Sequence, residues 1–221
     1  MKYKYVFKFI VIGEVAVGKT SFINQFVTEK FNESYTATLG IDIANKIIDI
    51  NNEKVNLIVW DTAGSEAFRS LTRSYYRAVA GIFLLFDITN PQSFEKVKFW
   101  LEECRANSNK TASIILVGNK SDLQAQRKVT RAEAMLFAEK NNIEYIEASS
   151  TSYDLVLKAF LKMATNIYQK IRDGTINVND NESGARLSEE YLKDGGGGEK
   201  GKTILDGNLG KFDAIKGKKC C

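Results

Sequence analysis

A chain of 221 residues, 44% hydrophobic and 26% charged, is long enough for one buried domain and an appendage, and no apolar run approaches the roughly 18 residues of a membrane-spanning helix. Because there is no histidine and two of the three cysteines are the last two residues, a Cys/His metal site and a disulfide framework are excluded, which fits a reducing compartment. The net charge of +4, without a basic stripe interleaved with aromatic residues, is too weak to indicate nucleic acid as a partner, and none is expected.

Up to about Arg172, apolar runs alternate with segments of helical period, which predicts an α/β domain with a mostly parallel sheet. The first run leads directly into a glycine motif, so we interpret it as a strand and not as a secretory signal, and we expect the chain inside the cell. The turn signal Asn51-Asn52 separates the second and third runs and predicts an antiparallel hairpin. The predicted strands are residues 5–12, 41–50, 55–60, 81–87, 113–118 and 144–148.

Two helix starts are marked by capping residues. Asn90-Pro91 places the only proline where the first helical residue needs no amide donor, and Thr130 with Glu133 predicts a capping box. Apolar side chains spaced three and four apart predict core-facing stripes on two helices. These stripes are Phe94, Val97, Trp100, Leu101 and Cys104 on the first helix, and Val156, Phe160, Met163, Ile167 and Ile171 on the last.

A glycine motif follows the first strand. Its sequence, Gly13-Glu-Val-Ala-Val-Gly18-Lys19-Thr20, matches G-x-x-x-x-G-K-[ST] and opens a helix. Glycines allow successive backbone amides to turn inward around phosphates, and the helix N-terminus adds partial positive charge. We expect Lys19 to reach the β- and γ-phosphates and Thr20 to hold Mg²⁺. The predicted phosphate-binding residues are Gly13, Glu14, Val15, Ala16, Val17, Gly18, Lys19, Thr20 and Ser21.

Two further motifs stand at strand ends. In Trp60-Asp61-Thr62-Ala63-Gly64, Asp61 is the expected acid on the metal side, and Gly64 lets its amide approach the γ-phosphate. In Asn119-Lys120-Ser121-Asp122, the carboxylate of Asp122 accepts from the ring N–H and exocyclic amine of guanine, whereas adenine presents the wrong pattern. Three such motifs in this order predict a site for GTP or GDP with Mg²⁺.

With these motifs, residues 7–172 resemble the Ras superfamily of small GTPases, and within it the Rab family. The implied fold is a P-loop small G domain with a six-stranded, mostly parallel sheet that contains one antiparallel strand and is flanked by about five helices. The resemblance implies that Phe31 contacts the guanine edge, that Tyr35 and Thr38 belong to the first switch, and that Thr38 is a second Mg²⁺ ligand. The Rab-like stretches are residues 56–60, 68–72, 75–78 and 84–89, and Ser149, Ser150 and Thr151 resemble the last guanine loop.

The resemblance also implies a switch in which Thr38 and Gly64 hold the γ-phosphate and its loss frees both switch segments. Effectors are then expected to contact Ile43, Trp60 and Tyr75, although interior packing is the alternative interpretation of the two aromatic residues. Ile43 stands where the family usually has Phe. The other expected partners are an exchange factor, an activating protein and a GDP-dissociation inhibitor or escort protein, and the G domain is expected to be monomeric.

Three departures from the family pattern bear on the mechanism. Ser65 replaces the Gln that orients the attacking water, so we expect slow unassisted hydrolysis at a site that also uses Lys19, Thr38 and Gly64. Val15 adds a branched side chain to the phosphate loop, and Thr151 replaces the usual Lys. The alternatives are a hydrolysis-deficient scaffold that stays mostly GTP-bound, and an ATPase or kinase, which Asp122 disfavours.

After Arg172, Asn, Asp, Gly and Lys dominate, so residues 173–221 are predicted to be a flexible tail on a G domain of residues 1–172. The end, Lys216-Gly-Lys-Lys-Cys220-Cys221, resembles the doubly geranylgeranylated end of Rab proteins. Two prenyl chains imply durable anchoring at the cytoplasmic face of an intracellular membrane, with cycling through the cytosol and a role in vesicle traffic. An unmodified disordered end is the alternative.

Overall fold

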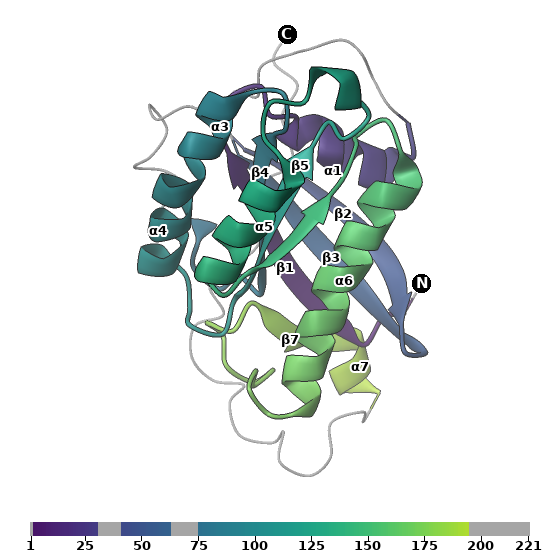
Figure 1. The fold of residues 1–221 in the computed structure, drawn as a ribbon. Helices are drawn as coiled ribbons and strands as arrows, with labels where there is room; N and C mark the ends of the chain where they lie inside the picture. Colours follow the sequence, from purple (N-terminus) through teal and green to yellow (C-terminus); the bar gives the residue numbers. More distant parts are fainter. Residues whose placement is uncertain (1, 31–40, 63–74, 195–221) are drawn as a thin grey trace, which may run out of the picture.

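A mixed sheet of seven strands runs through the centre of the molecule, with helices on both of its faces (Figure 1). The computed structural model describes residues 2–30, 41–62 and 75–194. The strands are β1 (Tyr5–Gly13), β2 (Ile41–Ile50), β3 (Glu53–Thr62), β4 (Gly81–Asp87), β5 (Ser113–Asn119), β6 (Glu144–Glu147) and β7 (Ala185–Leu187). The helices are α1 (Lys19–Thr28), α3 (Pro91–Glu95), α4 (Val97–Asn107), the 3₁₀ helix η3 (Gln124–Gln126), α5 (Arg131–Lys140), α6 (Tyr153–Arg172) and α7 (Glu189–Lys193).

The strand order β2-β3-β1-β4-β5-β6 is that of a doubly wound sheet. Strands β3, β1, β4, β5 and β6 are parallel, and β2 is antiparallel to β3. The predicted hairpin is present: Ile50 pairs with Glu53, and Asn51 and Asn52 both have left-handed φ angles of 49° and 65°, as a tight two-residue hairpin turn requires. The predicted α/β fold class is therefore confirmed.

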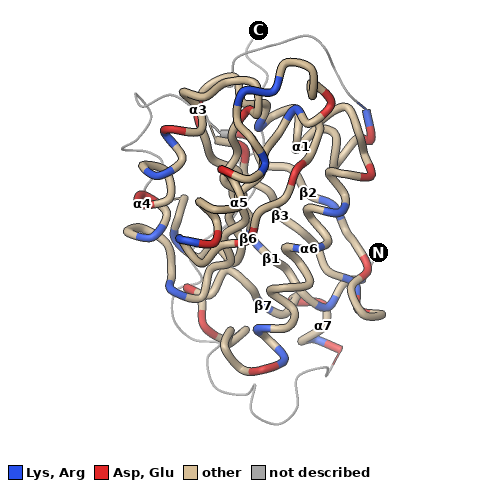
Figure 2. The backbone as a smooth tube through the Cα atoms, in the orientation of Figure 1, with Lys and Arg blue, Asp and Glu red and all other residues tan. Residues whose placement is uncertain are grey.

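The central strand β1 serves two cores because its side chains alternate between the faces of the sheet. Phe7, Phe9 and Val11 belong to the cluster under α1 and α6, whereas Ile10 and Ile12 belong to the cluster under α4 and α5. In the first cluster, the ring of Phe160 stacks on that of Phe26 at 3.7 Å between centroids. Figure 2 shows Lys, Arg, Asp and Glu positions distributed along α4, α5 and α6, and the buried residues of these helices are mostly apolar.

The predicted helix caps are confirmed. The side chain of Asn90 accepts from the amide of Gln92 with Pro91 at the first helical position, and Thr130 and Glu133 form the reciprocal capping box. The helix expected after Pro91 is divided at Lys96 into α3 and α4, although Lys96 keeps helical backbone angles. Among the helices in the described ranges, none combines the length and apolarity needed to cross a bilayer.

The prediction of a flexible tail from residue 173 onwards needs correction, because residues 173–194 pack onto the domain. Strand β7 pairs antiparallel with β1, with Phe7 opposite Ala185. The side chains of Ile176 and Ala185 are buried in the core, and the hydroxyl of Ser188 donates to the carbonyl of Tyr3. We call residues 173–194 the strap. The predicted site residues Phe31, Tyr35, Thr38, Gly64, Ser65, Cys220 and Cys221 lie outside the described residues.

The strap has a place to dock because β4 does not cover the whole edge of β1. Pairing between β1 and β4 begins at Phe9, so the β1 residues before Phe9 have an edge that β4 leaves open. Strand β7 covers that edge, and the amide of Lys8 donates to the carbonyl of Gly184. An edge that forms only after the sheet has assembled gives no signal in the local sequence of the strap.

Substitution of Gly184 by Ala tests the docking of the strap. Gly184 has a φ of +72°, and a Cβ there would lie 2.2 Å from the amide nitrogen of Ala80, so the strap must shift or detach. We expect the free energy of unfolding in urea to fall by about 2 to 4 kcal/mol and trypsin to cut the strap more readily. The matched control is Gly174→Ala, where φ is +81° but no atom lies within 4 Å, so about 1 kcal/mol is expected. Equal losses in the two variants would contradict close docking.

Candidate nucleotide site

The glycine motif forms a tight loop between β1 and α1 at the carboxyl edge of the sheet. Gly13 and Gly18 have φ angles of 141° and 90°, which L side chains rarely adopt. A Cβ on Gly13 would lie 2.2 Å from the carbonyl oxygen of Leu85, and one on Gly18 would lie 2.6 Å from Nδ2 of Asn119. Both glycines are therefore required by the close approach of neighbouring groups, and the loop leads directly into the N-terminus of α1, where an anion is stabilised.

Lys19 is almost fully buried beneath this loop. Its Nζ donates to the carbonyls of Gly13 at 2.9 Å and Glu14 at 2.8 Å. Burial lowers the pKa of Lys19 to about 8, and the negative charges of Asp61 and Glu14 offset part of that shift. A phosphate group bound in the loop would supply the counter-charge that favours the protonated form of this buried ammonium group.

Thr20 and Asp61 meet at the neighbouring strand end, as predicted. Asp61 is buried and lies opposite Val11 in the β1–β3 register, and the hydroxyl of Thr20 donates to its Oδ2 at 2.5 Å. A hydroxyl and a carboxylate are hard oxygen ligands of the kind that Mg²⁺ takes together with phosphate oxygens. The part of the chain that the structure describes contains no group of three or more His, Cys, Asp or Glu side chains that could hold a metal ion.

The Asn119-Lys-Ser-Asp122 motif closes the other side of the site. Asn119 is fully buried and its Nδ2 donates to the carbonyl of Val17 at 2.8 Å, which joins this motif to the phosphate loop. Lys120 has a left-handed φ of 63° and its Nζ forms an ion pair with Asp87 at 2.6 Å. The carboxylate of Asp122 is exposed, as a group that receives a base must be.

The three residues predicted as the last guanine loop form hydrogen bonds that reach Asp122 and Asn119 of the Asn119-Lys-Ser-Asp122 motif. The hydroxyl of Ser149 donates to the carboxylate of Asp122. The Ser149 hydroxyl has only one proton, and Asp122 takes it. The Thr151 hydroxyl must therefore donate to the Ser149 Oγ, at 2.6 Å, and the Thr151 amide also donates to the Ser149 Oγ, at 3.1 Å. Ser150 is buried against Asn119. Thr151, where the sequence departs from the family pattern, is thus the outer member of a hydroxyl relay that holds Asp122.

Comparison with known families agrees with this geometry. The model of the Ras family matches residues 8–169. The chain belongs to the Ras family. It is a small GTPase, and the family's nucleotides, GTP and GDP with Mg²⁺, fit the loop, the Thr20–Asp61 pair and the exposed carboxylate of Asp122. Among the predicted site residues that the structure describes, those of the phosphate loop, the metal side and the base side lie at the carboxyl ends of β1, β3 and β5 and in the loop after β6.

The three residues predicted for effector contact lie together beside the site of this small GTPase. Ile43 is the register partner of Trp60 across the β2–β3 hairpin and is 55% exposed. The rings of Trp60 and Tyr75 lie 5.2 Å apart, and the Nζ of Lys8 stands 4.3 Å from the centroid of the Trp60 ring. Trp60 and Tyr75 are each half-buried, so they pack against one another and still present part of their surface.

Sequence reasoning missed one contact of the phosphate loop. The indole Nε1 of Trp100, on α4, donates to Oε1 of Glu14 at 2.9 Å. The sequence places Trp100 on the apolar stripe of its helix, and its ring is buried among apolar groups. Its polar atom, however, reaches out of that core to a residue 86 positions earlier in the chain, and no local pattern indicates such a pairing.

Substitution of Trp100 by Phe tests this contact. The ring is kept but the donor is lost, so we expect the free energy of unfolding of the GDP-bound GTPase to fall by about 1 to 2 kcal/mol and GDP to dissociate faster because the loop is less restrained. Urea unfolding and displacement of a fluorescent GDP analogue measure the two effects. In a Glu14→Ala background the same substitution should cost much less, because the acceptor is already gone. An unchanged cost in that background would show that Trp100 acts only through its packing.

Proposed function

We propose that this small GTPase is a Rab-like regulator of vesicle traffic. The observation that carries the proposal is the surface formed by Ile43, Trp60 and Tyr75, where an exposed aliphatic side chain lies beside two paired, half-buried rings. In the Rab pattern these positions contact effectors in the GTP form. An apolar surface at the hairpin next to the nucleotide site is suited to a partner that distinguishes the two nucleotide states.

The proposal includes a membrane anchor and a cycle. Geranylgeranyl groups on Cys220 and Cys221 hold the protein at the cytoplasmic face of an intracellular membrane, and a GDP-dissociation inhibitor or escort protein carries the GDP form through the cytosol. An exchange factor loads GTP and an activating protein stimulates hydrolysis. Two prenyl chains are enough for stable anchoring, whereas one acyl chain binds only marginally.

The unassisted hydrolysis rate is proposed to be low. Ser65 is too short to orient the attacking water as Gln does. Val15, in the phosphate loop itself, is 50% exposed, so its branched side chain projects from the loop and not into the core. That exposure also favours the second candidate function, a membrane-anchored scaffold that stays GTP-bound and recruits effectors without cycling.

Analysis of the full-length protein isolated from its own cells tests both candidates. Extracted nucleotide should be mainly GDP for a cycling regulator and mainly GTP for a scaffold, and intact mass should show two added isoprenoids. Replacing Cys220 and Cys221 by Ser should move the protein from membranes to the cytosol, and its depletion should slow transport of a secreted reporter. Bare thiols, or normal transport after depletion, would contradict the proposed role.

A further inference from the structure

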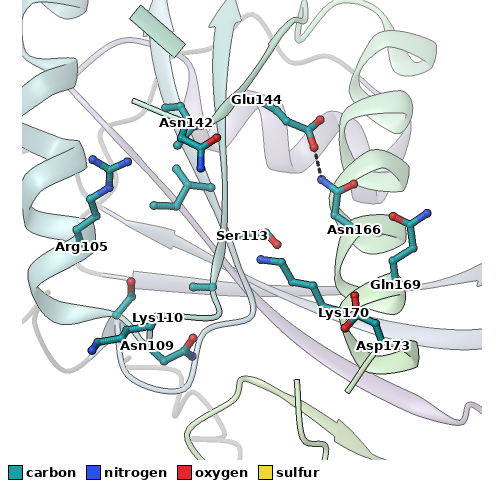
Figure 3. Close-up of a pocket in the computed structure, with 14 residues that line it drawn as sticks. Arg105, Asn109, Lys110, Ser113, Asn142, Glu144, Asn166, Gln169, Lys170 and Asp173 are labelled. Carbon is teal, nitrogen blue, oxygen red and sulfur yellow. Dashed lines mark hydrogen bonds between the residues drawn. The ribbon is translucent and has the colours of Figure 1, made fainter. Parts of the chain in front are cut away.

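A polar cavity of about 700 Å³ opens at the end of the sheet opposite the nucleotide site (Figure 3). It lies where β5 and β6 begin, between the ends of α4 and α6, whereas the nucleotide motifs lie where β1, β3 and β5 end. Its volume falls within the range of small-molecule sites. The cavity uses none of the residues assigned to GTP, Mg²⁺ or effector contact.

Ser113 supplies a buried hydroxyl to this cavity. The residue is only 6% exposed, and within the described part of the chain its Oγ has no hydrogen-bond partner. Its backbone is fixed, because its amide donates to the carbonyl of Ala80 at 2.9 Å and Ser113 pairs with Gly81 in the β4–β5 register. A buried hydroxyl without a partner is costly, so a polar group that fills the cavity and accepts from Ser113 would be stabilised there.

Lys170 supplies a cation beside that hydroxyl. Figure 3 shows its side chain running from α6 toward Ser113. Its Nζ donates to the carbonyl of Thr111 at 2.9 Å, which leaves further N–H groups for a ligand, and burial lowers its pKa. An anion in the cavity would stabilise the charged form of this half-buried ammonium group.

The two carboxylates of the cavity do not cancel this cation. Glu144 accepts from the side chain of Asn166 at 2.7 Å and pairs with Lys162 at 3.1 Å, so its charge is already compensated. Asp173, exposed at the rim, and Glu144 both act to raise the pKa of Lys170, but burial lowers it by more, so the two carboxylates compensate this cation only in part. Two further cations, Arg105 and Lys110, are exposed at the opposite rim. The inner surface therefore presents hydrogen-bond donors and positive charge.

We propose that this cavity binds a phosphate monoester group, with the hydroxyl of Ser113 and the ammonium group of Lys170 as its inner donors. A doubly charged phosphate has oxygens enough for both inner donors and for a rim cation at once. Two sources carry such a group: a soluble phosphorylated molecule and the headgroup of a membrane lipid. The cavity adjoins the strap, because the side chain of Asn109, which lines the cavity, donates to the backbone carbonyl of Glu182, and the strap precedes Cys220 and Cys221 in the sequence.

The test is a titration of full-length protein loaded with GDP and Mg²⁺, so that the nucleotide site is already filled. Backbone amide NMR signals of Ser113, Glu144, Asn166 and Lys170 should shift saturably with inorganic phosphate. Binding should weaken about fivefold in Ser113→Ala and about tenfold in Lys170→Gln, and it should not change in Lys158→Gln, an exposed lysine of the same helix outside the cavity. GDP dissociation should be the same in all four proteins.

The proposal would be overturned by signals that do not saturate or by equal phosphate affinity in wild type and Ser113→Ala. Tighter binding of acetate than of phosphate would also overturn the proposal, because that preference would identify a site for carboxylates.

Binding to vesicles of phosphatidylcholine with phosphatidic acid separates the two sources of the phosphate group. Binding lost in Ser113→Ala identifies a lipid headgroup, and binding of glycerol phosphate without vesicle binding identifies a soluble ligand. Because Ser113→Ala changes neither the nucleotide site nor the terminal cysteines, its result is independent of the proposed function.

Discussion

Replacing Asp122 by Ala is expected to remove most of the preference of this small GTPase for guanine over adenine nucleotides. The exposed carboxylate of Asp122 accepts from the hydroxyl of Ser149, and we expect it to accept also from the two N–H groups of guanine that adenine lacks. Sites built to hydrogen-bond one ligand discriminate on the order of 10⁴-fold, so the ratio of GTP to ATP affinity should fall by roughly 10² to 10⁴. Competition of unlabelled nucleotides against a fluorescent GDP analogue in magnesium buffer measures that ratio.

Two matched variants show whether the fall in the ratio of GTP to ATP affinity results from lost hydrogen bonds or from the loss of a negative charge. Asp154→Ala removes another exposed carboxylate, at the start of α6, and should leave the ratio unchanged. Ser149→Ala keeps the carboxylate but removes the hydroxyl that holds it, so the ratio should fall about tenfold. If Asp122→Ala retained the full preference for guanine, the base-reading role of this motif would be wrong.

The elements that the sequence predicted are those determined by neighbouring residues. Pro91 after Asn90 places a helix start, and Asn51-Asn52 can form only a tight turn between two apolar strands. The order of strand, glycine loop and helix likewise identifies Lys19 and Thr20 from the sequence alone. In each case the physical cause lies within a few residues of the feature, so a local pattern is enough to reveal it.

The features that the sequence did not reveal depend on groups brought together by the fold. Strand β7 docks because β4 leaves one edge of β1 open, and the strap itself has too few apolar residues to stand out. The bond from Trp100 to Glu14 and the unpartnered hydroxyl of Ser113 arise from the same cause. The relay from Thr151 through Ser149 to Asp122 shows this most directly, since the substitution at Thr151 was visible in the sequence but its contact was not.

Replacing Ser65 by Gln is expected to accelerate unassisted GTP hydrolysis on the order of 10- to 100-fold. The longer amide side chain can both donate to and accept from a water molecule next to the γ-phosphate, whereas the serine hydroxyl is too short to reach that water. Single-turnover cleavage of GTP preloaded on the purified protein, without any activating protein, measures the chemical step. Ser65→Ala is the control. Its hydrolysis rate should equal that of the wild type, because we expect the serine hydroxyl to contribute nothing to hydrolysis.

We propose that Val15 limits how large that gain can be, because its side chain is 50% exposed on the phosphate loop and would restrict the space open to a catalytic amide. Val15→Gly alone should then change the hydrolysis rate little, while Val15→Gly with Ser65→Gln should exceed Ser65→Gln several-fold. Such coupling is expected only if both residues limit the same step. If the double variant hydrolyses GTP no faster than Ser65→Gln, Val15 does not obstruct the water. If Ser65→Gln itself gives no acceleration, the slow step lies elsewhere, and the GTP-bound scaffold loses its proposed chemical cause.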